Sequence, residues 1–284
     1  MESQYTAAQR AEMLDTLNRA MQWILDRTVP LFALAPRGVP VLEGTGVLVQ
    51  IADAHFLFTA AHVVGGIVKD GRALLFGTQD GLFSLEGLDV KVSDDREDVD
   101  VAFIRMPQQL ADEVAPRKSF VRLSEVDMER RAPRVGSYGV LGFPRGLRTL
   151  DPASGFQRPD PYWILGSLYE GVPDRFTVGQ SIAVGFTPHS YEDHTGKRAR
   201  HPALQGISGC GIWRIIGPDD GEPGTSWDPA EMIKLAGIEH GTIGDAIKGV
   251  LAFRAIDAIG QNYSDLKPAI ELHRAKIDEA LSSR

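Results

Sequence analysis

Apolar residues recur at helical spacing at both ends of the chain. Over residues 6–27, Thr6 and Gln9 have the spacing of a capping box, and Pro30 follows as a helix breaker. The apolar positions of this stretch are Met13, Leu14, Leu17, Met21, Ile24 and Leu25. Leu266–Leu281 shows the same periodicity, with Ile270 and Ile277 in register. We therefore expect one helix at each end of the chain, packed against the body of the protein.

Between these helices the apolar residues form short runs, rich in β-branched and aromatic side chains and separated by Gly, Asp and Pro. The first runs are Gly46–Ile51, His55–Thr59, Ala73–Phe76, Leu88–Val92, Val101–Arg105 and Phe120–Leu123. After the polar stretch Ser124–Pro133 come Ser137–Gly142, Tyr162–Tyr169, Phe176–Val184, Gly211–Ile216, Ile233–Ile238 and Gly249–Ala252. Short strands at near-regular spacing, with few helices between them, favour antiparallel barrels or a sandwich over an α/β sheet.

Composition narrows the class of protein. With 284 residues, 43% of them hydrophobic, the chain can bury a core without a metal or disulfide staple, and its single cysteine cannot form an internal bridge. A net charge of −8 argues against a nucleic-acid partner. The longest apolar runs fall short of a membrane span, and the chain opens without the pattern of a secretory signal. We therefore expect a cytoplasmic protein that contacts neither nucleic acid nor membrane.

The first candidate for chemistry is a histidine at the end of a strand pattern, in Phe58-Thr59-Ala60-Ala61-His62-Val63. The two small alanines leave room for the His62 imidazole to reach across a cleft. A lone histidine at a strand end is also a common structural residue. This string alone therefore leaves both interpretations open.

The second candidate is an acid that begins an apolar strand, in Asp98-Val99-Asp100-Val101-Ala102-Phe103-Ile104. A catalytic histidine is often oriented by a buried carboxylate that accepts its second ring N–H. The acidic run 94–100 could also form a solvated turn. Asp100 lies nearest the apolar residues and is the member most expected to point inward.

The third candidate is a serine between glycines, in Gln205-Gly206-Ile207-Ser208-Gly209-Cys210-Gly211. Glycines allow a tight turn that exposes the Ser208 hydroxyl and lets backbone N–H groups converge on a developing oxyanion. The nucleophile elbow of the α/β-hydrolases competes as an explanation. It requires a glycine where Cys210 stands, a helix after the serine and a histidine last in the chain, so it is disfavoured.

The three strings place His62, Asp100 and Ser208 in the order His–Asp–Ser, within two sets of strands. At these residues the chain resembles the trypsin-like (chymotrypsin-fold) serine peptidases, in the form without disulfides known from intracellular bacterial members. The resemblance covers roughly residues 40–260 and lies in the strings Thr59-Ala60-Ala61-His62, Asp100-Val101-Ala102-Phe103-Ile104 and Gly206-Ile207-Ser208-Gly209.

The resemblance implies an all-β fold of two antiparallel six-stranded β-barrels, with a helix at each end of the chain. It divides the chain into an N-terminal helical extension (1–37), a first barrel (38–132), a second barrel (133–262) and a C-terminal helix (263–284). The catalytic residues would meet in the cleft between the barrels.

The resemblance also implies roles for individual residues. Ser208 would be the nucleophile, His62 the general base and then acid, and Asp100 the group that orients His62. The backbone N–H groups of Gly206 and Ser208 would form the oxyanion hole. Around the specificity pocket, the implied substrate-binding residues are Gln205, Ile238, Glu239 and His240. Glu239 could select basic side chains and His240 acidic ones, or both could be turn residues outside the pocket.

Two departures from the family pattern bear on regulation and on the nucleophile. Ile207 stands where zymogen-type members carry an acid, so activation by cleavage is not expected. Viral relatives use a cysteine in a Gly-x-Cys-Gly string, but Ser208 occupies the first position of that string here. We expect Cys210 to be a small buried residue, as free cysteines commonly are.

The function predicted from the sequence is a serine endopeptidase that cleaves protein or peptide substrates without a metal or other cofactor. It would be dedicated to one task or switched by a regulatory protein partner, since a cytoplasmic peptidase must be kept from indiscriminate cleavage. The alternative is a catalytically silent or latent binding module with a protease fold.

Overall fold

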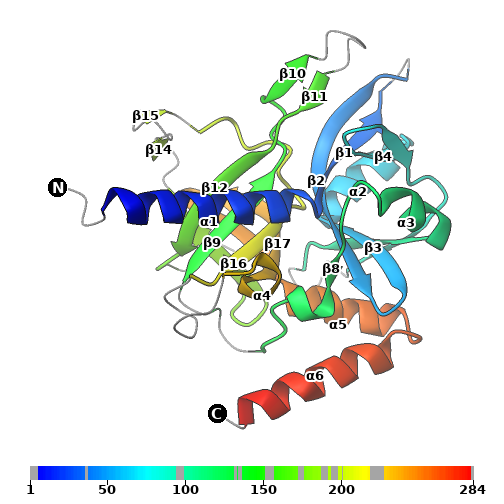
Figure 1. The fold of residues 1–284 in the computed structure, drawn as a ribbon. Helices are drawn as coiled ribbons and strands as arrows, with labels where there is room; N and C mark the ends of the chain where they lie inside the picture. The colour runs from blue at the N-terminus through cyan, green and yellow to red at the C-terminus, as the bar shows by residue number, and fades with distance from the viewer. Residues whose placement is uncertain are drawn as a thin grey trace.

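The computed structural model is mostly β, with two curved sheets and helices at both ends of the chain (Figure 1). It describes residues 6–35, 38–93, 99–130, 133, 136–150, 157–171, 176–186, 191–192, 198–199, 201–217 and 227–282. None of the helices in these ranges combines the length and the apolar character that crossing a bilayer requires.

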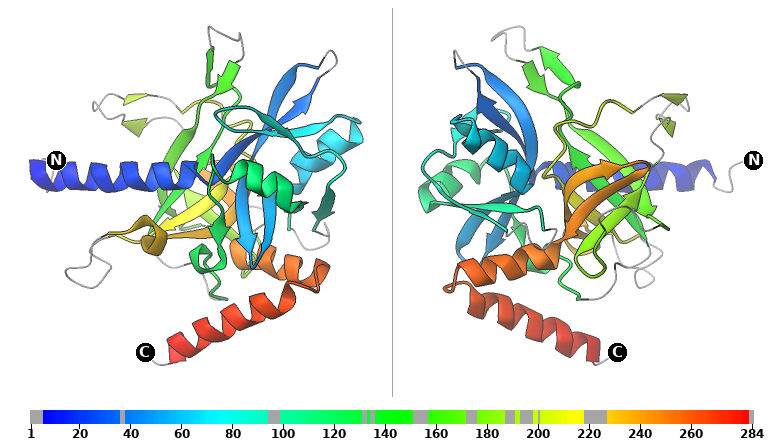
Figure 2. Two further views of the ribbon diagram at one scale, coloured as in Figure 1. Left: turned by 45° about the vertical axis from the view of Figure 1, so that its right-hand side comes forward. Right: turned by 180° about the vertical axis from the view of Figure 1, so that it is seen from behind.

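The first half of the molecule is an eight-stranded sheet that curls without closing among the described residues (Figure 2). Its order is β5-β4-β1-β2-β3-β7-β6, and β8 pairs with β2 in parallel. The strands are β1 (Thr28–Leu34), β2 (Pro40–Ile51), β3 (Ala54–Thr59), β4 (Leu74–Gly77), β5 (Leu82–Ser84), β6 (Asp89–Val92), β7 (Ala102–Met106) and β8 (Val121–Arg122). The curled sheet takes the place of the first barrel, with more strands than the six expected.

Strand β1 was not predicted, because Pro30 was taken only as the end of a helix. The strand pairs with β2 along its whole length, whereas β4 pairs only with Leu31–Ala33. Pro30 therefore lies just outside the segment of β1 that pairs with β4, so no hydrogen bond to β4 is lost through its missing N–H. The first sheet thus begins inside the segment 1–37 that was expected to be a helical extension.

The second half is a closed barrel of six strands in the order β12-β13-β18-β17-β16-β9, which confirms the six-stranded barrel expected there. Its strands are β9 (Ser137–Gly142), β12 (Tyr162–Leu168), β13 (Ser181–Gly185), β16 (Gly211–Ile215), β17 (Ile233–Ile243) and β18 (Ala246–Leu251). Two small pairs, β10 (Arg148–Leu150) with β11 (Gln157–Pro159) and β14 (Tyr191–Glu192) with β15 (Arg198–Ala199), lie outside the barrel.

Both terminal helices form, and Thr6 caps the first with the predicted capping box. The helices are α1 (Ala7–Leu25), α2 (Ala61–Lys69), α3 (Gln108–Val114), α4 (Pro229–Met232), α5 (Ala252–Asn262) and α6 (Lys267–Ser282), with a 3₁₀ turn η2 (Leu123–Glu125). Helix α5 lies in the segment assigned to the second barrel and was missed. Its buried Phe253, Ile256 and Ile259 recur at helical spacing, which the preceding apolar strand obscured.

Helix α5 connects the two halves. It packs on β17 and β18 of the closed barrel, and it ends beside the first sheet (Figure 2). There the Tyr263 hydroxyl donates to Asp89 Oδ2 at 2.8 Å and the Arg105 guanidinium donates to Asp265 at 2.9 Å. Phe56 packs edge-on against Tyr263, with ring centroids 5.4 Å apart. These contacts between the end of α5 and the first sheet therefore hold the two halves together.

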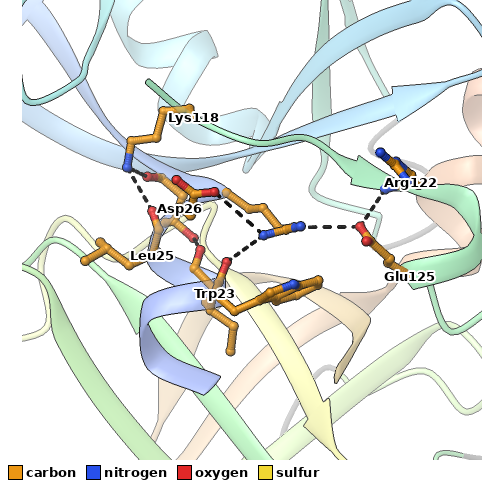
Figure 3. A network of polar contacts seen from close by, with 9 residues as sticks. Trp23, Leu25, Asp26, Lys118, Arg122 and Glu125 are labelled. Atoms are coloured by element: carbon orange, nitrogen blue, oxygen red, sulfur yellow. Dashed lines mark hydrogen bonds and ion pairs between the residues drawn. The ribbon is translucent and has the colours of Figure 1, made fainter. Parts of the chain in front are cut away.

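A network of polar contacts fixes the C-terminal end of α1 (Figure 3). The Lys118 ammonium donates to the carbonyls of Leu25 and Thr28, at 2.8 and 3.1 Å. The Arg27 guanidinium lies 3.6 Å from the centroid of the Trp23 ring and 3.7 Å from the Glu125 carboxylate. Lys118 thus satisfies the Leu25 carbonyl, and the Arg27 guanidinium donates to the Trp23 carbonyl at 2.9 Å, so both cations pair with carbonyls that a helix end leaves unpaired. Burial lowers the pKa of the Lys118 ammonium.

Candidate active site

His62 lies in the first turn of α2, where the chain leaves β3. Ala60 caps the helix in an extended conformation and is fully buried, and Ala61 and Val63 on either side of His62 are buried as well. The neighbours therefore fix the helix start in the core, while half of the His62 side chain is exposed. The histidine expected at the end of a strand thus sits on a helix that the sequence pattern did not predict.

Asp100 holds His62 by two separate bonds. Its Oδ2 lies 2.6 Å from His62 Nδ1, and its Oδ1 accepts from the His62 backbone N–H at 2.9 Å. Val99 and Val101, on either side of Asp100, are buried, and this anchors the carboxylate at the start of β7. Two bonds from one carboxylate to the ring and the backbone of the same residue fix the orientation of the imidazole.

This pairing shifts the pKa values of both residues. The hydrogen bond to Asp100 raises the pKa of His62, although burial opposes the shift. Burial acts to raise the pKa of Asp100, but the hydrogen bond and charge of His62 outweigh it and leave that pKa lowered. Asp100 is therefore ionised at neutral pH, with the imidazole as its main partner.

Ser208 lies on a turn that two glycines make possible. Gly206 and Gly209 have φ angles of 100° and 91°, in the left-handed region that glycine adopts without strain. Both are also packed too closely for a side chain. A Cβ on Gly206 would stand 2.7 Å from the Phe143 carbonyl oxygen, and one on Gly209 would stand 2.8 Å from Ala60 N. The glycines predicted to form a tight turn therefore do so.

The same turn presents two backbone donors. The N–H groups of Gly206 and Ser208 donate no hydrogen bond to any residue that the structure describes. The Gln205 carbonyl accepts from Arg145 N at 2.7 Å. Because N–H and C=O point in opposite directions across a trans peptide, the Gly206 N–H faces away from Arg145. An oxyanion hole needs two such uncommitted donors.

The Ser208 turn is attached directly to the half that carries His62. Thr45 of β2 donates its backbone N–H to the Ser208 carbonyl at 2.8 Å and its hydroxyl to the Gly206 carbonyl at 2.8 Å. The Thr59 hydroxyl donates to the Thr45 carbonyl at 2.8 Å, and Gly209 packs against Thr59. Sequence reasoning gave neither threonine a role: Thr59 stood unremarked in the His62 string, and Thr45 lay just before the predicted strand Gly46–Ile51.

Within the described part of the chain, no hydrogen bond joins the Ser208 hydroxyl to the His62 ring. The contacts of Thr45, Thr59 and Gly209 nevertheless bring the Ser208 turn to the start of α2. Gly209 packs against Ala60, which caps this helix, and His62 follows two residues later. His62 and Asp100 thus lie in one half and bond to each other, and the turn of Ser208, from the other half, packs against the residues just before His62.

A cavity of about 570 Å³ opens beside the His62–Asp100 pair. His240 and Lys248 contribute the other polar side chains of its wall. The Gln205, Ile238 and Glu239 side chains do not line this cavity, although sequence reasoning grouped them with His240 as substrate-binding residues. Burial lowers the pKa of His240 to about 4, so this imidazole is neutral in the wall.

Cys210 and Glu239 are buried beneath the Ser208 turn. Cys210 is fully buried as expected, and burial raises the pKa of its thiol well above the ordinary value, so it remains protonated. Glu239 is only 1% exposed, so its carboxyl is covered in this structure. The described residues contain no group of histidine, cysteine and acidic side chains that could hold a metal ion.

The chain was also compared with known proteins. It matches no protein-family model, and no curated protein matches it. Among solved structures it is similar to an HtrA-type protease with a tripeptide, at 13% identity and a TM-score of 0.48, over 84% of this chain and 61% of that one. The match thus spans less than two thirds of that protease.

Two further similar structures match over most of both chains. A serine protease of a human pathogenic astrovirus has 13% identity and a TM-score of 0.40, over 80% of this chain and 89% of that one. The Rv3671c protease in an inactive form has 15% identity and a TM-score of 0.46, over 87% and 93%.

The topology itself gives the fold. A curled sheet carries His62 and Asp100, a closed six-stranded barrel carries Ser208, and the site lies where the two halves meet. The single cysteine excludes an internal disulfide. The chain has the two-barrel fold of the trypsin-like serine proteases.

Proposed function

We propose that the protein is a serine endopeptidase that hydrolyses peptide bonds in protein substrates through an acyl-enzyme. The observation that supports this most strongly is the pair of hydrogen bonds from Asp100 to the ring and to the backbone of His62, in the half that packs against the turn of the half-buried Ser208. A carboxylate that only stabilised the fold would have no need to fix the tautomer of a half-exposed imidazole.

In the proposed reaction, Ser208 Oγ attacks the carbonyl carbon of the scissile peptide bond. His62 Nε2 accepts the hydroxyl proton, while Nδ1–H donates to Asp100, whose negative charge stabilises the imidazolium. The negative charge on the former carbonyl oxygen is stabilised by the N–H groups of Gly206 and Ser208. His62 then gives the proton to the nitrogen of the leaving amine as the C–N bond breaks, which leaves the acyl group on Ser208. In the second half of the reaction His62 takes a proton from water, whose oxygen attacks the acyl carbon, and gives that proton to Ser208 Oγ as the ester bond breaks.

Ser208 is the nucleophile in this proposal, and Cys210 is not. A protonated thiol is a poor nucleophile, and burial keeps Cys210 both protonated and inaccessible. Ser208 is partly exposed at the tip of its turn, next to the two free donors.

The pH profile of hydrolysis tests the pair of His62 and Asp100. We expect activity to fall with decreasing pH as His62 protonates, with a midpoint above 6.5, because Asp100 raises the pKa of His62. Asp100→Asn should reduce kcat by about 10⁴-fold and move the midpoint of the residual activity to lower pH. An unchanged midpoint in a well-folded Asp100→Asn variant would contradict the proposed role of Asp100.

A latent form of the same enzyme is the second candidate, supported by the lack of a Ser208–His62 hydrogen bond among the described residues. We propose that such an enzyme would be dedicated to few substrates or switched by a protein partner in the cytoplasm. Helix α1 supports a partner contact, because Met13 and Leu14 on its outer part are about half exposed. Steady hydrolysis of peptides by the isolated chain would contradict latency.

A further inference from the structure

Glu239 is a buried acidic side chain that the proposed reaction does not use. It lies on β17 directly beneath the Ser208 turn, is 1% exposed, and its Oε2 has no hydrogen-bond partner among the described residues. Burying a carboxylate that has one oxygen without a partner is costly, so a carboxyl in such a place is expected either to take up a proton or to act on a neighbouring charge.

The backbone of Glu239 holds both residues that follow Ser208. Its carbonyl accepts from Gly209 N at 2.8 Å, and its N–H donates to the Cys210 carbonyl at 2.8 Å. Glu239 of β17 therefore fixes the Ser208 turn together with Thr45. A change in the charge of the Glu239 side chain would therefore occur next to Gly209, the residue that follows Ser208.

The charges that surround the Glu239 carboxyl come from several elements. His62 on α2 and Asp100 before β7 both interact with it electrostatically, with opposite signs. The Cys210 thiol and the N–H groups of Gly209 and Gly241 also face it. His240 is its neighbour in β17, and Lys248 lies on the paired strand β18.

The carboxyl groups of Asp100 and Glu239 thus both act on the His62 imidazole, but only that of Glu239 is fully buried. Asp100 has the imidazole as its hydrogen-bond partner and stays ionised. Glu239 lacks such a partner, and burial raises its pKa to about 8, against the weaker opposing effect of His62. At neutral pH the site then carries one negative charge rather than two.

We propose that Glu239 is a positioning residue of this site: its backbone anchors the Ser208 turn, and its buried carboxyl acts on the His62–Asp100 pair. The inference rests on the proposed function for its role in catalysis. The charge coupling itself does not depend on any substrate. When His62 becomes cationic, the Glu239 proton is held less tightly, and an ionised Glu239 in turn makes His62 a stronger base.

The pH dependence of stability tests the inference without a substrate. A carboxyl whose pKa rises on folding binds more protons in the folded than in the unfolded chain between its two pKa values. The free energy of unfolding of the wild type should therefore fall relative to that of Glu239→Gln as the pH rises from about 4.5 to about 8, and should fall no further above that. Chemical denaturation of both proteins at a series of pH values measures this change. A packing effect of glutamine would shift the free energy by the same amount at every pH.

The His62 imidazole supplies a second readout, by NMR of the full chain. We expect its resonances to shift in two steps in the wild type, the second near pH 8 where Glu239 ionises, and in one step in Glu239→Gln. Glu125→Gln is the matched control, because Glu125 is also buried but lies at the 3₁₀ turn η2, and it should keep both steps.

The wild-type titration alone decides the matter if Glu239→Gln fails to fold. A single His62 step through pH 8, or parallel stability curves for wild type and Glu239→Gln, would overturn the inference. Failure of the proposed peptidase activity would be seen separately, as a Ser208 that does not react.

Discussion

At the scale of single residues, the site depends on small side chains as much as on reactive ones. Gly206 and Gly209 allow the turn that exposes Ser208, and Ala60 and Ala61 allow α2 to begin against the core. Sequence reasoning found His62, Asp100 and Ser208 because each stood in a short, recognisable string. It left Glu239 between the wall of a specificity pocket and a turn outside it, because the burial of a side chain depends on what the rest of the chain places over its strand.

Gly209→Ala tests the turn at this scale. The new Cβ would meet the Thr59 hydroxyl and the Thr45 carbonyl and stand 2.8 Å from Ala60 N, in a backbone conformation that alanine rarely adopts. We expect the rate of hydrolysis to fall by about 10²-fold or more, because the adjacent Ser208 N–H would be displaced. Unchanged kcat/KM in this variant would contradict the proposed oxyanion hole.

Gly66→Ala is the matched control for that substitution. Gly66 lies in α2, and a Cβ added there would have no atom of the described residues within 4 Å beyond its own helix backbone and chain neighbours. Alanine there should raise the free energy of unfolding by about 0.5–1 kcal/mol, because glycine is unfavourable inside a helix, and should leave kcat unchanged.

At the scale of elements, periodicity predicted what was long and regular and missed what was short or interrupted. The two terminal helices and the six strands of the second barrel were identified. Strand β1 was missed because Pro30 lies in it, and α2 was missed because its nine residues follow a strand without a break. Strand β17 is longer and β13 is shorter than predicted. Pairing with neighbouring strands sets where each strand ends, and the pattern of apolar residues along one strand does not contain that information.

The end of α1 provides a prediction at this scale. Lys118→Met would leave the Leu25 and Thr28 carbonyls without the ammonium that now satisfies them. We expect the free energy of unfolding to fall by about 1–3 kcal/mol, measured by chemical denaturation. Lys69→Met, at an exposed lysine in the last turn of α2, should change it by less than about 0.5 kcal/mol. Equal effects of the two substitutions would contradict the anchoring role of Lys118.

At the scale of the whole molecule, the candidate site exists only where the halves meet. Thr45 is fully buried, and its hydroxyl donates to the Gly206 carbonyl and accepts from Phe143 N at 3.1 Å, so one side chain of the first half holds two segments of the second. Nothing in the sequence marked this residue, because its role depends on packing between segments about 100 and 160 residues apart.

Thr45→Val tests that junction. The substitution keeps the shape of the side chain and removes its hydroxyl, leaving the Gly206 carbonyl and Phe143 N–H unpaired. We expect a loss of stability of about 1–3 kcal/mol and a slower reaction of Ser208 in the folded protein. Thr28→Val removes another buried hydroxyl, which donates to the Ile24 carbonyl away from the site. It should lower stability and leave the reactivity of Ser208 unchanged.

An activated Ser208 hydroxyl should react with a fluorophosphonate probe. Covalent labelling of wild type and Ser208→Ala, followed by peptide mapping, measures this reaction. We expect one labelled residue, Ser208, in the wild type and no labelling in the folded Ser208→Ala variant. Wild-type protein that is folded but unlabelled, or that is labelled at another residue, would contradict an activated Ser208 hydroxyl.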